Sequence, residues 1–127
     1  MANPFKSIPI YIKLYVNEVE ITRLDTGQTV SQIASRNISN DRLVVADFQE
    51  TEILLKRVLS CLIPKKIFMP QLNIIIHQLD YITGGLSPTE KRILINVAKR
   101  IGGKNVIVEE DLNPLSFLHA KTKFKVE

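Results

Sequence analysis

The feature that most constrains the fold is a change in the spacing of apolar residues before the midpoint of the chain. From residue 8 to residue 34 apolar and polar side chains mostly alternate, which is the period of strands with one buried face. From Asp47 onward apolar residues recur every three or four positions, which is the period of amphipathic helices. The chain is therefore predicted to begin with strands and to continue with both helices and strands.

Three antiparallel strands are predicted in the first part of the chain. Apolar side chains alternate through residues 10–16 and again through residues 19–21, and a turn at Val16-Asn17-Glu18 separates the two runs. Asp25-Thr26-Gly27 predicts a second turn, because glycine permits a positive φ angle, and residues 29–33 can return as the third strand. These strands form a predicted meander, followed by a polar loop over residues 36–41.

The first predicted helix follows this loop. Asp47 and Glu50 resemble a capping box, and the apolar stripe behind them ends before Pro64. The single cysteine, Cys61, falls within this helical pattern and is predicted to be a buried thiol without catalytic use. Residues 72–77 form a short apolar run of the kind found in a strand covered on both faces.

The clearest helix start lies after this strand. Ser87, Pro88 and Glu90 predict a capped helix, which Gly102-Gly103 ends. Residues 106–108 then predict a fifth strand, and a third, shorter helix is predicted to begin at Asn113-Pro114.

The predicted order of elements is βββαβαβα. Right-handed crossovers place the fourth and fifth strands parallel to the first, which gives an α/β fold with a mixed five-stranded sheet and three helices. This is the chain order of the ribonuclease-H-like fold, which also forms the core of each half of actin. A length of 127 residues suits a single domain, here 1–127, with the meander in 1–41 and the crossovers in 42–127.

The segment from residue 44 to residue 59, VVADFQETEILLKRVL, resembles the V-I-A-D-F-x-x-T-E-x-M-L stretch of MreB, the bacterial actin homologue of the rod shape-determining protein family. Residues 70–120 are similar to the strands and helices that follow in that family. The matching positions are Asp47-Phe48, Thr51-Glu52, Glu90-Lys91-Arg92 and Glu109-Glu110. The resemblance implies the first subdomain of an MreB-like actin.

The nucleotide motifs that the resemblance implies are degenerate or absent. The family's first hairpin carries a D-x-G-T phosphate loop, whereas IYIKLYVNEVEI has no glycine and places Lys13 near the expected Asp. The family's second phosphate loop and Gly-Gly motif have no match in these 127 residues, and its inserted small subdomain corresponds at most to the loop 35–41. The water-positioning acid would fall on Glu110 or be displaced onto Asn113. Lys13, Asp47 and Glu110 are therefore the vestigial positions of a cofactor site, and no bound cofactor is expected.

Other kinds of site are weakly supported by the residues. Asp25, Asp47, Asp80 and Asp111 could hold two metal ions in a ribonuclease-H-like nuclease, but such a nuclease needs an Asp where the first strand offers only Lys13. The histidines, His77 and His119, have no metal-ligating neighbours at suitable spacing, so a packed or surface role is expected for each. Gly84-Gly85 is interpreted as a connecting loop, since no phosphate-binding glycine motif surrounds it. No catalytic residue and no metal site are predicted.

The charge of +4 raises the question of nucleic acid, but the basic residues are dispersed. Lys65-Lys66 is assigned to a loop, and only Lys121, Lys123 and Lys125 in the C-terminal tail resemble a patch. No specific nucleic-acid partner is expected. The longest apolar runs are far short of the roughly 20 residues that span a bilayer, so no transmembrane segment and a cytoplasmic location are expected.

The sequence predicts a non-enzymatic module for protein interaction or assembly, in a cytoskeletal or cell-shape setting. Two alternatives remain open: a fragment of, or a partner to, a complete actin-like ATPase, and a weak nucleic-acid-binding domain. A strand order of 3-2-1-4-5 puts residues 28–34 and 105–108 at the edges of the sheet. The candidate contact residues are Gln28, Val30 and Gln32, and pairing through this edge would give a homodimer. The alternative is a monomer in which the tail from Lys121 to Glu127 covers the edge.

Overall fold

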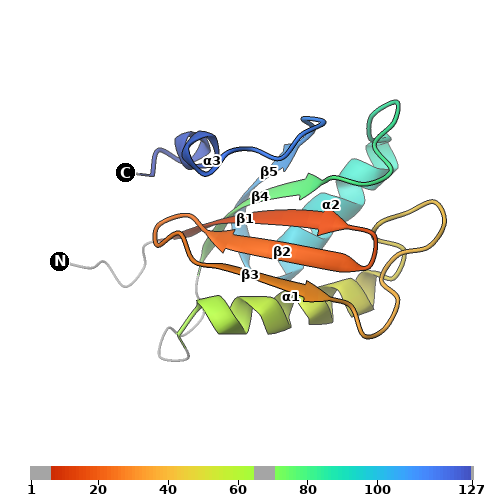
Figure 1. The fold of residues 1–127 in the computed structure, drawn as a ribbon, viewed down its shortest axis with the longest axis horizontal. Coiled ribbons are helices and arrows are strands. Elements are labelled where there is room, and N and C mark those ends of the chain that lie inside the picture. Colours follow the sequence, from red (N-terminus) through yellow and green to blue (C-terminus); the bar gives the residue numbers. More distant parts are fainter. Residues whose placement is uncertain (1–6, 65–70, 127) are drawn as a thin grey trace.

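A mixed five-stranded sheet runs through the molecule, with two helices on one face and a short helix on the other (Figure 1). The computed structural model describes residues 7–64 and 71–126. The elements are β1 (Ile8–Tyr15), β2 (Glu18–Arg23), β3 (Thr29–Ile33), α1 (Phe48–Leu62), β4 (Leu72–Gln78), α2 (Pro88–Arg100), β5 (Gly103–Glu109) and α3 (Phe117–Lys123). The predicted α/β class and element order are confirmed.

The strand order in the sheet is β3-β2-β1-β4-β5, as predicted. The first three strands pair in antiparallel fashion, because short turns join them, whereas β4 and β5 lie parallel to β1 after helical crossovers. The turn between β1 and β2 uses Asn17 with a φ of 53°, a left-handed conformation that asparagine tolerates better than most residues. β3 and β5 are the edge strands.

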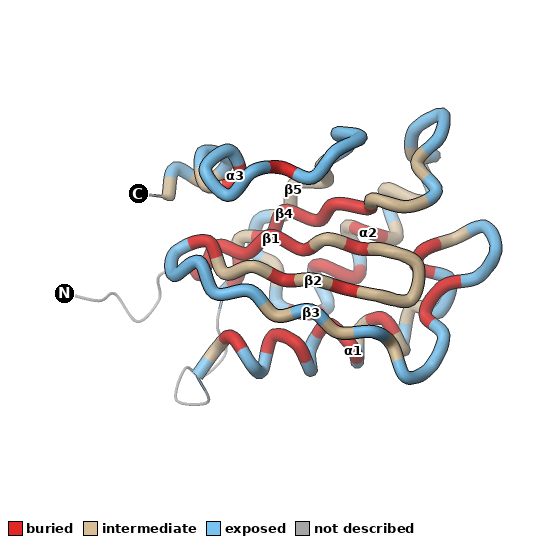
Figure 2. Tube along the Cα trace, in the orientation of Figure 1, coloured by how far each residue is buried: buried red, intermediate tan, exposed pale blue. Residues whose placement is uncertain are grey.

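The main core lies between the sheet and the helices α1 and α2. Alternate residues of β1 face these helices, and Ile10, Ile12 and Leu14 are fully buried there. Leu55 and Val97 are buried from the helix side, and Figure 2 shows the buried positions concentrated along the central strands. Burial of each such side chain contributes about 1.5–3 kcal/mol, so this layer is the main source of stability.

A second, smaller core lies on the opposite face of the sheet. It contains Tyr11, Leu24, Ile75, Leu115 and Ala120. The last two residues come from α3 and the segment before it, which cover part of this face (Figure 1). The C-terminal segment is therefore part of the folded domain.

The two long helices begin at their predicted caps, although the capping box is complete only in α2. Asp47 Oδ1 accepts from Glu50 N at 2.9 Å, but Asp47 N donates to Ile38 O at 3.0 Å, and no bond returns from Glu50. In α2 both halves form, at 3.1 Å and 3.0 Å between Ser87 and Glu90. In α1 the backbone N–H of Asp47 therefore bonds to the loop 35–47 and not to Glu50, as it would in a complete capping box.

Two predictions are wrong. Cys61 is exposed, because it lies roughly a quarter turn away from the centre of the buried stripe of α1. The third helix begins at Phe117, with Ser116 as its cap, and not at Asn113-Pro114. The residues before it are held in a turn, since Asn113 N donates to Asp111 Oδ1 at 3.0 Å. The predicted loop at Lys65-Lys66 lies outside the described residues.

Within the described ranges, none of the helices combines the length and the apolar content that crossing a bilayer requires.

Candidate functional site

The three residues that would mark a vestigial nucleotide site lie on different elements. Lys13 Nζ is 3.0 Å from Glu20 Oε2 and 5.3 Å from the centre of the Tyr11 ring, on the face covered by α3. Asp47 caps α1 on the other face, while Glu110 follows β5 and pairs with Lys91 at 3.2 Å. Among the described residues, no ion pair or hydrogen bond joins any two of the three positions.

The tip of the first hairpin is bonded to the rest of the chain. Val16 N donates to Asp80 Oδ2 at 2.7 Å, and Asn17 N donates to Ser39 Oγ at 2.9 Å. Asn17 Oδ1 in turn accepts from the backbone of Ile38 and Ser39. Phosphate loops bind anions with free backbone N–H groups, and the amides of Val16 and Asn17 are already engaged.

The carboxylates considered for a metal site also have separate partners. Asp25 accepts two bonds from Arg23 at the turn between β2 and β3, whereas Asp80 lies beyond the end of β4. Asp111 Oδ1 accepts from Asn113 N. In the described part of the chain no three His, Cys, Asp or Glu side chains come together as a metal site would need.

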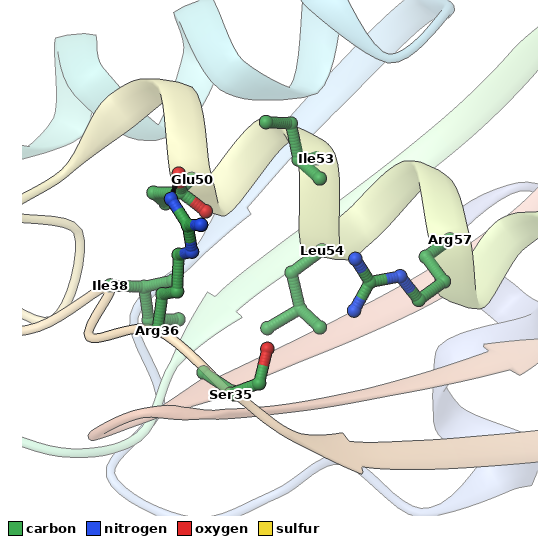
Figure 3. A pocket seen from close by; sticks show the side chains of 8 residues that line it. Ser35, Arg36, Ile38, Glu50, Ile53, Leu54 and Arg57 are labelled. Atoms are coloured by element: carbon green, nitrogen blue, oxygen red, sulfur yellow. Dashed lines mark ion pairs between the residues drawn. The ribbon is translucent and has the colours of Figure 1, made fainter.

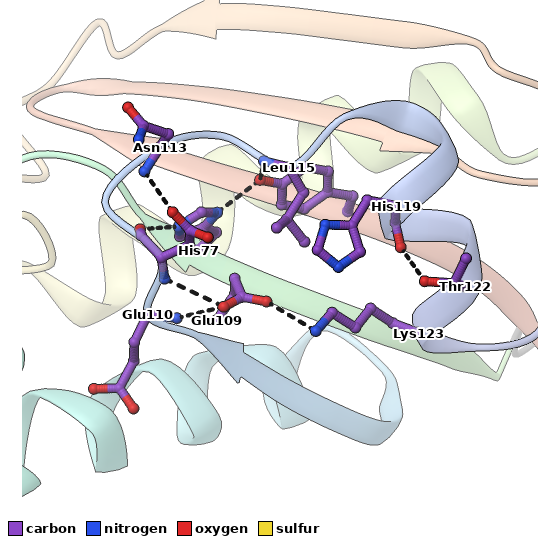
Figure 4. A network of polar contacts seen from close by, with 10 residues as sticks. His77, Glu109, Glu110, Asn113, Leu115, His119, Thr122 and Lys123 are labelled. Atoms are coloured by element: carbon purple, nitrogen blue, oxygen red, sulfur yellow. Dashed lines mark hydrogen bonds and ion pairs between the residues drawn. The ribbon is translucent and has the colours of Figure 1, made fainter.

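A buried polar cluster joins the sheet to the C-terminal segment (Figure 4). His77 Nε2 lies 2.7 Å from the carbonyl oxygen of Asp111, which can only accept, so this nitrogen carries the proton. Nδ1 then accepts from Tyr11 Oη at 2.6 Å, and the same hydroxyl accepts from Leu115 N at 2.9 Å. His77 is thus packed and fully bonded, which agrees with one of the two roles expected for it. His119, the other histidine, lies exposed on α3.

The surroundings shift the pKa of two groups at this cluster, Tyr11 and Glu109. Burial raises the pKa of Tyr11 to about 12, with smaller contributions from nearby negative charges, although the bond from Leu115 N lowers it. Burial disfavours the charged form of Glu109, but the N–H groups of Glu110 and Asp111 and the ammonium of Lys123 outweigh it, so the pKa of Glu109 is lowered. The polar atoms of the cluster bond to one another, and the cluster holds the C-terminal segment on the sheet.

Of the three lysines in the C-terminal tail, Lys123 is the one with an acidic partner among the described residues. Lys123 Nζ is 3.4 Å from Glu109 Oε1 on β5, and Lys121 Nζ lies 5.3 Å from the centre of the Phe117 ring. The described part of the tail packs near β5 and the second core, and no backbone hydrogen bond joins it to β3. The tail up to Val126 therefore leaves the β3 edge uncovered.

Among the residues that the structure describes, none pairs through its backbone with the outer side of β3. Arg23 N donates to Gln28 O at 2.8 Å, and Ala34 N donates to Asn17 O at 2.9 Å. Because bonded pairs alternate in an antiparallel ladder, this register directs the N–H and C=O groups of residues 28, 30, 32 and 34 toward β2. The outward-facing groups belong to Thr29, Ser31 and Ile33.

The residues predicted to make contacts, Gln28, Val30 and Gln32, are those whose backbone groups point toward β2. Val30 packs against the main core, and Gln32 shares its face of the sheet. Ile33 lies on the opposite face with 72% of its surface exposed. The sequence contained the signal for this feature, an edge strand without lysine or proline, but the register was needed to assign its two sides.

The helix α1 lies along this edge of the sheet (Figure 1). Between its first turns and the end of β3 is a hollow of about 10 Å³ (Figure 3). Its lining includes Arg36, Glu50, Ile53, Leu54 and Arg57. The hollow has room for about one water molecule. Together, β3 and this side of α1 form an open edge with a positively charged border, which is the candidate interaction site.

No protein-family model matches the chain. Over 93 residues it is 32% identical to the uncharacterized protein YjaA of Escherichia coli K12, and the match covers 69% of this chain and 72% of that protein.

Among solved structures, MreB 5 of Spiroplasma citri bound to AMPPNP superimposes with a TM-score of 0.60 and 18% identity. The superposition covers 83% of this chain and 39% of that chain, so the present sequence spans about two fifths of MreB 5. The PPX-GPPA enzyme of Aquifex aeolicus matches with a TM-score of 0.44 and 16% identity over 81% of this chain and 36% of that chain. The first likeness shows an actin-like fold.

Proposed function

This chain belongs to the family of the uncharacterized protein YjaA of Escherichia coli K12, and we propose that it is a non-enzymatic actin-like module that binds another protein chain at the β3 edge. Its setting in this proposal is the cytoplasm, in a cytoskeletal or cell-shape role like that of MreB proteins.

The observation that carries the proposal is the free side of β3. The N–H and C=O groups of Thr29, Ser31 and Ile33 point away from the sheet, and no described segment pairs with them. Such an edge is a template for strand addition, in which main-chain hydrogen bonds provide affinity. The strand has neither lysine nor proline to prevent pairing.

The hairpin supports the non-enzymatic part of the proposal. The amides of Val16 and Asn17 donate to Asp80 and Ser39, so a nucleotide phosphate would have to displace two formed hydrogen bonds. Lys13 is paired with Glu20, and it offers no carboxylate to a metal ion. We expect calorimetric titration with Mg-ATP to give no measurable heat of binding, and tight binding would contradict this part of the proposal.

Strand addition is tested with a photo-crosslinking amino acid at position 33 in cells that express the protein. We expect a discrete cross-linked product whose mass identifies the added chain as a second copy or another protein. Ser31→Pro removes one outward N–H and is tolerated on an edge strand, so it should abolish the product. Ser31→Thr keeps the N–H and should retain it.

The choice of Ser31 follows from the register. Val30→Pro would remove a bond between β2 and β3 and would damage the sheet itself. A cross-linker at Lys99, which is exposed on α2, provides the control for nonspecific products. If the product at position 33 persists in Ser31→Pro, or if none forms, binding at the edge is refuted.

A further inference from the structure

Building on the proposed function, we propose that the segment added to β3 is an extended stretch of a partner protein with an acidic side chain, which Arg57 and Arg36 bind at the hollow beside α1. The partner segment also carries an apolar residue that packs on Ile33.

The charges around the hollow are unbalanced. Arg36 has 81% of its side chain exposed, and its partner Glu50 is at 3.8 Å, close to the limit of an ion pair. Arg57 forms no ion pair among the described residues, and both arginines border the same hollow (Figure 3). The lining of the hollow therefore carries two guanidinium groups and one carboxylate.

An acidic side chain suits this arrangement better than other groups. A guanidinium can donate two parallel hydrogen bonds to a carboxylate, which makes arginine selective for planar anions. The hollow, about 10 Å³ in volume, is too small for a separate ligand but can take the tip of a side chain from a neighbouring strand. An added strand would bring such side chains along α1.

The alternation of side chains along a strand sets the spacing between the acidic and the apolar residue of the partner segment. Side chains that lie between β3 and α1 share the face of Val30, whereas Ile33 is on the opposite face. Because successive residues of a strand alternate between faces, the acidic and the apolar residue of the partner must be an odd number of positions apart. The partner motif is thus an acidic residue next to, or three positions from, an aliphatic or aromatic residue.

A second copy of this chain fits the edge less well. Two-fold antiparallel pairing about Ser31 would set Val30 opposite Gln32 of the copy. The β3 strand of a second copy, TVSQI, would bring no acidic side chain to the arginines beside α1. Five residues of strand are also few beside the 20–30 residues per side of a standard stable interface.

The test uses a phage-displayed library of random 12-residue peptides, selected on the purified 127-residue protein. Wild type should enrich peptides with Asp or Glu at one aligned position and an apolar residue an odd number of positions away. Arg57→Glu should replace that acidic preference by Lys or Arg, while Arg57→Lys should keep it. Lys99→Glu makes the same charge change on α2 and should leave the selected motif unchanged.

The affinity of a synthetic peptide with the selected sequence then measures how much Arg57 contributes to binding. Its affinity should fall about tenfold with Arg57→Glu, because an exposed ion pair is lost and a repulsion is added. The fall with Lys99→Glu should be less than about twofold, and circular dichroism verifies that each variant is folded.

The outcomes separate this inference from the function on which it rests. Enriched peptides that bind through Ser31 but lack an acidic position, or whose acidic preference survives Arg57→Glu, would overturn the acidic-partner inference alone. Peptides that bind Ser31→Pro as well as wild type, or no enrichment at all, would overturn strand addition too. A wild-type dimer in sedimentation that Ser31→Pro converts to a monomer would identify a second copy as the occupant and refute the inference.

Discussion

Replacing Tyr11 with phenylalanine removes one buried hydroxyl and should destabilise the whole C-terminal segment. That hydroxyl bonds His77 Nδ1 at 2.6 Å and accepts from Leu115 N at 2.9 Å, and Tyr11 is only 2% exposed. The substitution leaves one buried acceptor and one buried donor without partners, and each unsatisfied group costs about 1–3 kcal/mol. We expect a loss of about 2–4 kcal/mol in the free energy of unfolding.

Urea denaturation followed by circular dichroism measures this loss. With a slope of about 1.5 kcal/mol per molar urea, the midpoint should fall by about 1.3–2.7 M. Hydrogen exchange should locate the effect, since the Leu115 amide loses its acceptor and should exchange faster. Tyr81→Phe is the matched control, because Tyr81 is 42% exposed and should change stability by less than about 0.5 kcal/mol. A Tyr11→Phe protein within about 0.5 kcal/mol of wild type would refute the assigned network.

Four further measurements follow from the structure. The pKa of Tyr11 is raised from 10.0 to about 12, so the stabilisation that its neutral hydroxyl provides is complete below pH 10 and is lost as the pH rises through about 12. Over this interval the free energy of unfolding of wild type, measured by urea titration at each pH, should fall by about 2 kcal/mol relative to Tyr11→Phe. Asp47→Ala should cost about 1 kcal/mol in chemical denaturation, because Glu50 N loses its acceptor, while Asp47→Ser should recover most of it. Gly103→Ala should lower the thermal midpoint, with a cost of about 1–3 kcal/mol, since the added Cβ would lie 2.7 Å from the backbone oxygen of Ala98; an unchanged midpoint would contradict this contact. Binding to nucleic acid, measured by fluorescence anisotropy, should be weak and should fall steeply between roughly 50 and 200 mM salt, and submicromolar affinity that resists salt would show a specific site.

Much of the fold was predictable because its determinants are local. The alternation of apolar residues specifies a strand, and the Ser87-Pro88 start of α2 satisfies its own amides within one turn. The strand order then follows from short turns and right-handed crossovers. The same local pattern also contained the position of Cys61 off the buried stripe, so that error came from incomplete use of the helical period.

The candidate site depended on contacts between distant parts of the chain. Its free backbone groups could be assigned only once the register of β2 and β3 was known, since a shift of one residue exchanges the inward and outward amides. The border of arginines arises because α1 packs beside β3.

The sequence by itself determined the caps of the two long helices and the order of the elements, because these depend on spacings of a few residues. Only the tertiary structure decided which polar groups meet. Tyr11 lies 66 positions from His77 and 104 from Leu115, and Val16 lies 64 positions from Asp80. Such pairs form because burial makes an unpartnered polar group costly, and which partner satisfies it is set by the packing of the whole sheet.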